Sequence, residues 1–264
     1  MYPLLALNLR WILRDRTFQA LLAVSLLMIM LVPVISSFSM RQSQELAVTL
    51  SLSCISFILL VFSLLLGSTM IWRDIERRYT FAVLSLPKDR GSYLMAKFFS
   101  LTLFMAGSAL IATICSALAI WITAAIYPSA VPVRWEMIAL AVAMDLLKYL
   151  LLAAFALVVT TVSTSFFMPF FTTLAAFLAG SASQEVYDFV NSAHGAKMPA
   201  VSRVVAKAAY FVIPNFGAFD FKLQATYPIP FDAVHALYAL GYFVVYAGFL
   251  LALATWLFSR REIT

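Results

Sequence analysis

The stretch WRDIERRYTFAVLSLPKDRGSYLMAK, residues 72–97, decides the fold of this 264-residue chain. It holds nine charged side chains in 26 residues, although only 11% of the whole chain is charged. A charged side chain at the centre of a bilayer costs about 2.5–3.5 kcal/mol on insertion scales. We therefore expect this charged island, residues 72–97, to lie in water, and the apolar segments on either side of it to cross a membrane.

The composition excludes an ordinary soluble domain. Hydrophobic residues make up 64% of the chain, the mean hydropathy is +0.96, and several uncharged runs exceed twenty residues. About twenty apolar residues cross the hydrocarbon core once, so the chain is predicted to be an all-α, polytopic membrane protein. The net charge of +6 fits Lys and Arg held at the cytoplasmic face of such a protein better than it fits nucleic-acid binding.

Apolar runs separated by prolines and polar turns predict six spans in one transmembrane domain, residues 1–264. The uncharged run from Phe98 to Val133 is too long for one span, and Pro128 and Pro132 end its helix near Ile126. A polar turn, TTVSTS at 160–165, separates the fourth span from the fifth. The predicted spans are 18–35, 48–71, 98–126, 136–159, 166–182 and 234–258.

The distribution of positive charge predicts that both termini are cytoplasmic. With six spans, the basic residues of the N-terminus, the charged island and the C-terminus share one side, while only Arg41 and Arg134 lie in the two short loops opposite. A five-span arrangement is the alternative. It starts the fourth span near Tyr149, packs residues 149–184 into one helix, and leaves Arg260 and Arg261 outside.

Two segments outside the spans have helical apolar patterns. In residues 2–16 the apolar face faces away from Arg10 and Arg14, which predicts an amphipathic helix on the inner membrane surface, with a plain extension of the first span as the alternative. Residues 183–232 are richer in charge, proline and aromatic side chains, and predict short outer helices that dip into the outer leaflet. The apolar positions are Leu5, Leu9, Ile12 and Leu13 in the first segment, and Val201, Val204, Val205, Ala208, Phe211 and Val212 in the second.

Within the charged island, an apolar stripe at helical spacing predicts a short helix lying under the membrane, with Pro87 ending it. The stripe consists of Ile75, Tyr79, Ala82, Val83 and Leu86. Such a helix, mounted between the second and third spans, would act as a lever for a cytoplasmic partner. The alternative is a basic loop that only sets the topology.

Asp145 and Lys148 are the notable charges inside a predicted span. They are three positions apart, on one face of a helix, and Asp145 is ten residues beyond Trp135, hence about 15 Å deep. Two interpretations remain open: an ion pair that fixes helix packing, or a polar site that faces a translocation pathway.

The sequence predicts neither a catalytic residue nor a metal site. His194 and His235 have no HExxH pattern or cysteine partner, and Cys54 and Cys115 lie in apolar runs, as expected of buried free thiols. Tyr187 and Asp188 resemble half of an intramembrane aspartyl protease site, but the GxGD pattern for the second carboxylate is absent.

The N-terminal helix, the charged island with LeuSerLeuPro at 84–87, the six spans and the long outer segment together resemble the permease subunits of type-2 ABC exporters. Tyr79 stands where many relatives have glycine. In that family this loop forms a coupling helix, whose pattern falls here on Glu76, Arg77, Thr80, Leu84, Pro87, Arg90, Tyr93 and Lys97. The resemblance implies an ATPase-coupling site formed by Arg73, Asp74, Glu76, Arg77, Arg78, Thr80, Leu84, Pro87 and Arg90.

The resemblance also implies partners and a location. The chain lacks GxxxxGK[ST], so ATP and Mg²⁺ are expected in a separate ATPase subunit, present in two copies, and not in this chain. A second permease copy is expected, most simply as a homodimer, in the cytoplasmic (inner) membrane. A heterodimer stays open, the substrate is not indicated, and export is taken from the family. The alternatives are a membrane scaffold or assembly factor and, further off, an intramembrane enzyme.

Overall fold

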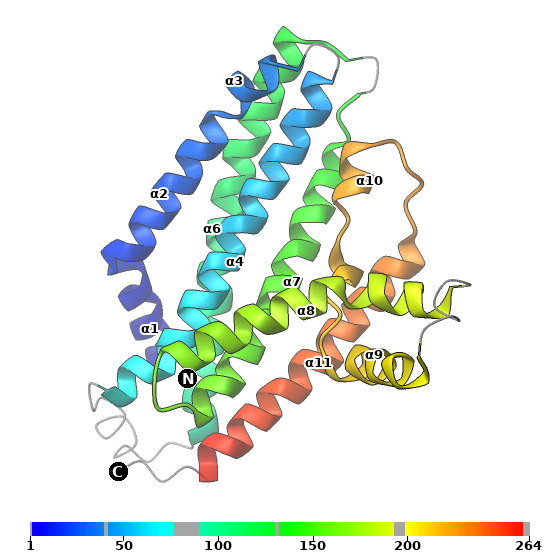
Figure 1. Cartoon of the computed structure of the whole chain (residues 1–264). Helices are drawn as coiled ribbons and strands as arrows, with labels where there is room; N and C mark the ends of the chain where they lie inside the picture. Colours follow the sequence, from blue (N-terminus) through cyan, green and yellow to red (C-terminus); the bar gives the residue numbers. More distant parts are fainter. Residues whose placement is uncertain (1, 40–41, 77–89, 130–131, 193–198, 261–264) are drawn as a thin grey trace.

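The computed structural model describes residues 2–39, 42–76, 90–129, 132–192 and 199–260. These residues form helices and contain no strand, which confirms the all-α prediction for the described part of the chain. Helices α2, α4, α6 and α7 run side by side along one direction, α8 crosses them, and α1 begins near the end at which α11 finishes (Figure 1). We call this the lower end. The helices are α1 (Tyr2–Arg14), α2 (Arg16–Met30), α3 (Val32–Ser37), α4 (Ser43–Glu76), α6 (Arg90–Ile126), α7 (Trp135–Val162), α8 (Phe167–Asn191), α9 (Ala200–Val212), η2 (Gly217–Phe219), α10 (Lys222–Thr226) and α11 (Ala233–Arg260).

Among the described residues, five helical segments are long and apolar enough to cross a membrane. They support a multi-pass membrane protein and correspond to the first four and the last of the six predicted spans. The predicted fifth span, 166–182, falls in α8, which does not belong to this group and continues to Asn191. The five segments are Arg16–Ser37, Ser43–Asp74, Gly91–Ile126, Trp135–Val162 and Ala233–Arg260.

The N-terminal helix α1 joins α2 at a capped bend (Figure 1). Asp15 Oδ1 accepts a hydrogen bond of 3.0 Å from Thr17 N–H, which satisfies an otherwise unpaired amide at the start of α2. Helix α1 packs against α6 and buries Ile12 completely. Leu13, from the same predicted apolar face, is 52% exposed and does not pack against the bundle.

Helices α4 and α7 form the centre of the bundle. A Cβ atom placed on Gly67 would lie 2.6 Å from Ala156 Cβ, so the two helices approach more closely here than any larger residue permits. Thr160 Oγ1 donates a hydrogen bond of 3.1 Å to Gly67 O at the same crossing. Hydroxyl and glycine contacts of this kind are typical of helices that associate in a membrane.

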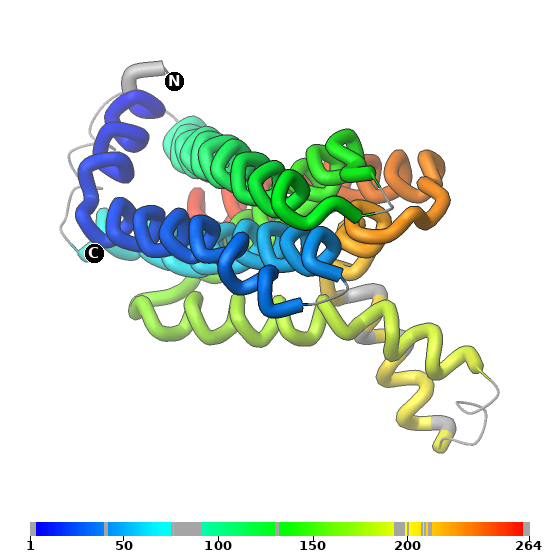
Figure 2. Tube along the Cα trace, turned by 90° about the horizontal axis from the view of Figure 1, so that it is seen from above, coloured from blue at the N-terminus to red at the C-terminus, as the bar shows by residue number. Residues whose placement is uncertain are grey.

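Helix α8 packs against α7 and α4, and its C-terminal part projects with α9 from the side of the bundle (Figure 2). After α9 the chain returns and packs against Gly180 of α8. A Cβ added at Gly180 would lie 2.3 Å from Pro214 O, and Phe216 N–H donates to Gly180 O at 3.2 Å. In α9 the predicted apolar stripe is exposed at Val201, Val204 and Val205.

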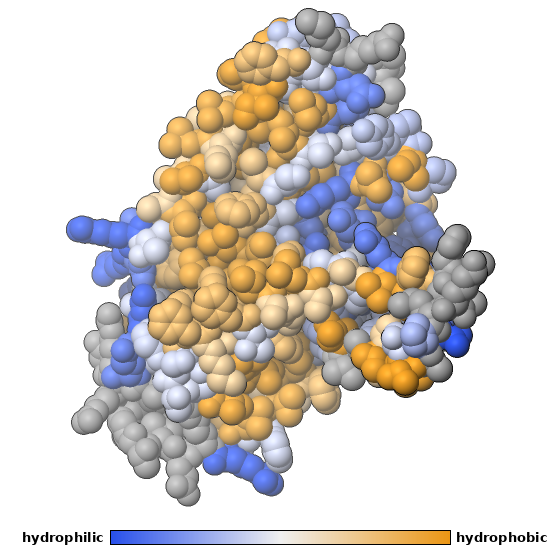
Figure 3. Space-filling model, viewed as in Figure 1, coloured by the Kyte–Doolittle hydropathy of each residue, from blue (hydrophilic) through white to orange (hydrophobic). Residues whose placement is uncertain are grey.

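Apolar side chains cover most of the face shown in Figure 3, as expected of a surface in contact with lipid. The same face turns hydrophilic where α10 lies beside α7, at the upper right of the view. Helix α10 carries Lys222, which belongs to the first of two charge clusters in the bundle.

Candidate functional site

The first cluster surrounds Asp145 at the middle of α7 and includes Ser56, Lys148 and Lys222. We call it the Asp145 cluster. Asp145 is 1% exposed, and its Oδ2 accepts a hydrogen bond from Ser56 Oγ on α4. Lys222 Nζ lies 3.9 Å from the same oxygen, which is an ion pair without a direct hydrogen bond. The other oxygen, Oδ1, has no hydrogen-bond partner among the described residues.

Lys148 is also buried, at 6% exposure, but within the described residues the lysine inside 4 Å of Asp145 is Lys222. The ammonium of Lys148 lies 5.5 Å from the ring centroid of Tyr149 and 5.7 Å from that of Phe177. Aromatic faces at this distance attract a cation. The predicted pair Asp145 and Lys148 is therefore one half of a larger group that includes a residue from a distant part of the chain.

Lys222 reaches Asp145 because the segment after η2 folds back onto the bundle. Asp220 Oδ1 accepts a hydrogen bond of 3.1 Å from Lys222 N–H at the start of α10. Helix α10 packs against α4 and α7, with the hydroxyls of Thr49 and Thr226 3.3 Å apart. The segment 183–232, which is predicted to form short outer helices, thus places the ammonium of Lys222 beside Asp145 in α7.

Chemically, the Asp145 cluster can bind a donor group. A buried carboxylate with one unbonded oxygen retains capacity for an N–H or O–H of a ligand, or for a proton. The two nearby lysines reduce the cost of keeping that carboxylate ionised.

The second cluster lies at the lower end and links the end of α4 to the start of α6, the two described parts of the charged island. Lys97 Nζ on α6 lies 2.6 Å from Asp74 Oδ2 on α4, and the hydroxyl of Tyr93 donates to the same oxygen. Lys97 Nζ also donates to Met70 O at 3.3 Å, and Lys97 is 4% exposed. We call Asp74, Tyr93 and Lys97 the Asp74 cluster.

Beside it, Arg73 connects α4 to the N-terminal helix. Arg73 Nη1 donates to Asp15 Oδ2 at 2.9 Å, and the guanidinium lies 4.8 Å from the ring centroid of Trp11. Partial burial alone would raise the pKa of Asp15, but hydrogen bonds from Arg73 and Thr17 outweigh it and hold that pKa below its ordinary value. The carboxylate is therefore stabilised in its charged form.

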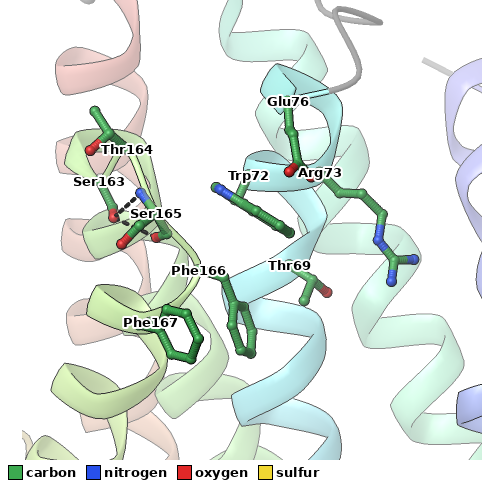
Figure 4. Close-up of a pocket in the computed structure, with 9 residues that line it drawn as sticks. All are labelled: Thr69, Trp72, Arg73, Glu76, Ser163, Thr164, Ser165, Phe166 and Phe167. Atoms are coloured by element: carbon green, nitrogen blue, oxygen red, sulfur yellow. Dashed lines mark hydrogen bonds between the residues drawn. The ribbon is translucent and has the colours of Figure 1, made fainter.

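A cavity of about 600 Å³ lies between the end of α4 and the turn that leads into α8 (Figure 4). The rings of Trp72 and Phe166 pack against each other in its lining, with centroids 5.9 Å apart. The Arg73 guanidinium points away from the Ser163–Ser165 turn, toward α1. The lining consists of Thr69, Trp72, Arg73, Glu76, Ser163, Thr164, Ser165, Phe166 and Phe167.

Of the predicted coupling residues, the structure places Arg73 and Asp74 in partly buried polar contacts and leaves Glu76 exposed at the end of α4. Helix α4 is continuous to Glu76, so the first part of the island extends the second span beyond its predicted end at 71. Arg90 begins α6. Outside the described residues lie Arg77, Arg78, Thr80, Leu84 and Pro87, and with them most of the predicted helix.

Sequence reasoning missed three partners in these clusters: Asp15, Ser56 and Lys222. Ser56 sits in an apolar run of ordinary appearance, and neither Asp15 nor Lys222 has a local pattern that points to its partner. No group of three or more His, Cys, Asp or Glu side chains that could hold a metal ion occurs in the part of the chain that the structure describes. Cys54 and Cys115 are free thiols, and both are half-buried.

The chain was compared with protein-family models and with curated proteins. Neither comparison finds a match to this sequence.

Proposed function

We propose that this chain is the permease subunit of an ATP-driven exporter of the type-2 ABC class, coupled to a separate ATPase through the charged island. The observation that carries the proposal is the pair of contacts at the base of the island, Asp74 with Lys97 and Arg73 with Asp15. Together they tie α1, α4 and α6 into one body beside the island. A partner that moved the island would therefore move three helices together.

The contacts within the bundle support transmission of such a movement toward Asp145. Helix α4 carries Asp74 at its lower end and Ser56 further along, and Ser56 donates to Asp145 on α7. The close approach of Gly67 and Ala156 lies between these points. Because packed helices move as units, a shift of α4 would alter the surroundings of Asp145.

In this proposal the Asp145 cluster lies on the translocation pathway, and the nucleotide acts only through its differential affinity for two states of the assembly. The chain itself holds no nucleotide in this scheme. The 600 Å³ cavity beside Glu76 is the contact region for the ATPase.

The first experiment is purification of the tagged chain in mild detergent from its native host, followed by identification of the proteins recovered in stoichiometric amount. We expect an ATPase with a GxxxxGK[ST] motif and a second permease copy. A matched pair of variants locates the contact: Glu76→Ala is expected to reduce recovery of the ATPase, whereas Arg14→Ala, at an exposed position on α1, is expected to leave it unchanged.

The two outcomes separate this proposal from the scaffold and enzyme alternatives. If the chain purifies without an ATPase under conditions that preserve other membrane complexes, the exporter proposal is wrong. If the ATPase is recovered, Arg77→Ala should uncouple its ATP hydrolysis from transport, and Asp145→Asn should reduce transport without loss of membrane insertion. Normal coupled transport in Glu76→Ala and Arg77→Ala would remove the assignment of the island.

A further inference from the structure

A second large cavity lies away from both charge clusters. Its volume is about 570 Å³, within the range of about 300–1,000 Å³ typical of small-molecule sites. It is formed by α8, α9, η2 and α11. The lining consists of Gln184, Tyr210, Asn215, Ala218, His235, Tyr238, Ala239, Tyr242 and Tyr246. We call it the tyrosine cavity.

One face of α11 supplies most of its wall. His235, Tyr238, Tyr242 and Tyr246 recur at intervals of three and four residues and so share one side of the helix. Tyr242 and Tyr246 have ring centroids 5.3 Å apart. Ala239, on the same side of α11, contributes a small side chain to this wall.

The polar groups of the tyrosine cavity form a connected but incomplete network. Gln184 Oε1 accepts hydrogen bonds from Asn215 Nδ2 at 2.7 Å and from the Tyr210 hydroxyl at 3.1 Å. The Tyr242 hydroxyl accepts a bond of 3.1 Å from Asn215 N–H. No described residue accepts the Tyr242 phenolic proton, and Asn215 Oδ1, in a residue that is 7% exposed, has no partner among them. The Tyr242 hydroxyl therefore offers a ligand a hydrogen-bond donor.

The charge of the lining restricts the ligand. No Asp, Glu, Lys or Arg belongs to the lining within the described residues. A phosphate or carboxylate would meet no lysine or arginine there, and a phosphocholine headgroup, whose ammonium could pack on the rings, would leave its phosphate without such a partner. An uncharged ring with hydroxyl or ether oxygens satisfies both features, because its C–H groups pack on the negative faces of aromatic rings and its oxygens accept the free phenolic proton.

The position along α11 indicates an amphiphile. His235 lies in the first turn of α11 and Tyr246 eleven residues further, hence about 16 Å deeper along a helix long and apolar enough to span the membrane. Tyr238 is 74% exposed on the lipid-facing side. A molecule in this cavity has its polar part near the start of the span and its apolar part against hydrocarbon.

We propose that the tyrosine cavity binds the headgroup of a membrane amphiphile whose headgroup is an uncharged, hydroxylated ring, such as a glycoside. The inference does not rest on the proposed exporter function, because it concerns equilibrium binding to this chain alone.

The test uses the full chain in lipid nanodiscs and three probes that share a ten-carbon tail: decyl glucoside, decylphosphocholine and decyl sulfate. Binding is measured by native mass spectrometry below the micelle concentration of each probe. We expect decyl glucoside to bind more tightly than the other two. Tyr242→Phe keeps the ring and removes the donor, and is expected to weaken decyl glucoside binding about 3- to 10-fold.

Controls separate the headgroup from the tail and from folding. Tyr238→Ala removes an exposed ring and should also weaken binding of decyl glucoside, whereas Tyr127→Phe, at an exposed position after α6, should leave it unchanged. Equal binding of all three probes, preference for decylphosphocholine, or unchanged affinity in both cavity variants would overturn the proposal. Methyl glucoside, which lacks the tail, is expected to bind at least tenfold more weakly. Equal affinity for it would overturn the assignment to an amphiphile.

Discussion

Each of the two charge clusters contains a carboxylate, a lysine ammonium and a hydroxyl, and the clusters differ in how closely the lysine approaches the carboxylate. In the Asp74 cluster the lysine nitrogen lies 2.6 Å from the carboxylate, which also accepts a tyrosine hydroxyl. In the Asp145 cluster the lysine nitrogen lies 3.9 Å away and one carboxylate oxygen is unbonded among the described residues. A close ion pair with a direct hydrogen bond fixes its helices, whereas a more distant pair keeps capacity for a ligand or for rearrangement.

The largest effect is expected from breaking the closer pair. Lys97→Met leaves Asp74, whose side chain is 22% exposed, with the Tyr93 hydroxyl but without its ammonium partner. Because breaking a fully buried pair costs about 3–5 kcal/mol, we expect a loss of up to about 3 kcal/mol for this partly buried one. We expect a large fall in the thermal midpoint of the purified protein, with partial recovery in Asp74→Asn/Lys97→Met, because the double variant removes the unpaired charge. If the thermal midpoint of Lys97→Met equals that of the control variant Arg14→Ala, the pair of Asp74 and Lys97 does not stabilise the fold.

The next effect tests the helix contact that connects the two clusters. Gly67→Ala places a methyl group 2.6 Å from Ala156 Cβ and should destabilise the protein by about 1–3 kcal/mol through overpacking. Gly107→Ala is the matched control, since no atom lies within 4 Å of its added methyl group. Alanine favours the helix over glycine, so the control should be neutral or stabilising in the same thermal assay. Equal responses at the two sites would contradict the close approach of α4 and α7.

A double-mutant cycle of Asp145→Asn and Lys222→Met measures the more distant pair directly. Lys222 is 24% exposed at its side chain and 3.9 Å from its partner, so we expect a coupling energy of about 1 kcal/mol or less. The same cycle at Asp74 and Lys97 should give a larger value. If the coupling energy between Asp145 and Lys222 equals or exceeds that between Asp74 and Lys97, the proposed difference between the two clusters is wrong.

The smallest effect is expected at Asp15, where the pair with Arg73 lies partly in water. Asp15→Asn retains a helix-capping oxygen and removes the charge, so it should cost about 0.2–1 kcal/mol at neutral pH. Because the folded pKa of Asp15 lies below its ordinary value of 3.8, this stabilisation is present above that value and is lost as the pH falls through the folded pKa. Chemical denaturation at pH 7 and at pH 3 or below should show the difference between variant and parent shrinking. A constant difference would contradict the ion pair.

The sequence predicts the long helices well because their signals are local. The fourth span was expected at 136–159 and the helix is Trp135–Val162, since the apolar run is bounded by a proline-containing loop and a polar turn. The predicted fifth span is less well described by the same reasoning. Its helix continues past 182 to Asn191 because a tertiary contact, the stacked rings of Tyr187 and Tyr210 at 4.2 Å, supports a polar sequence that hydropathy alone would end.

The candidate site was predictable only in part. Asp145 and Lys148 stand out as charges in an apolar run, but the residues that bond or pair with Asp145 come from α4 and from the segment at the start of α10. No periodicity connects positions so far apart. The charged island is recognisable from its charge, yet its link to the N-terminal helix through Asp15 depends on a bend between α1 and α2 that no local pattern predicts.

The Asp74 cluster has a consequence for biosynthesis. Tyr93 and Asp74 are 19 positions apart, so their contact closes a short loop, and it can form once α4 and the start of α6 have been made. Ser56 and Asp145 are 89 positions apart, and Lys222 is made later still. The α4–α6 hairpin can therefore assemble early, during synthesis, whereas Asp145 acquires its last partner only when the segment at α10 emerges and folds back.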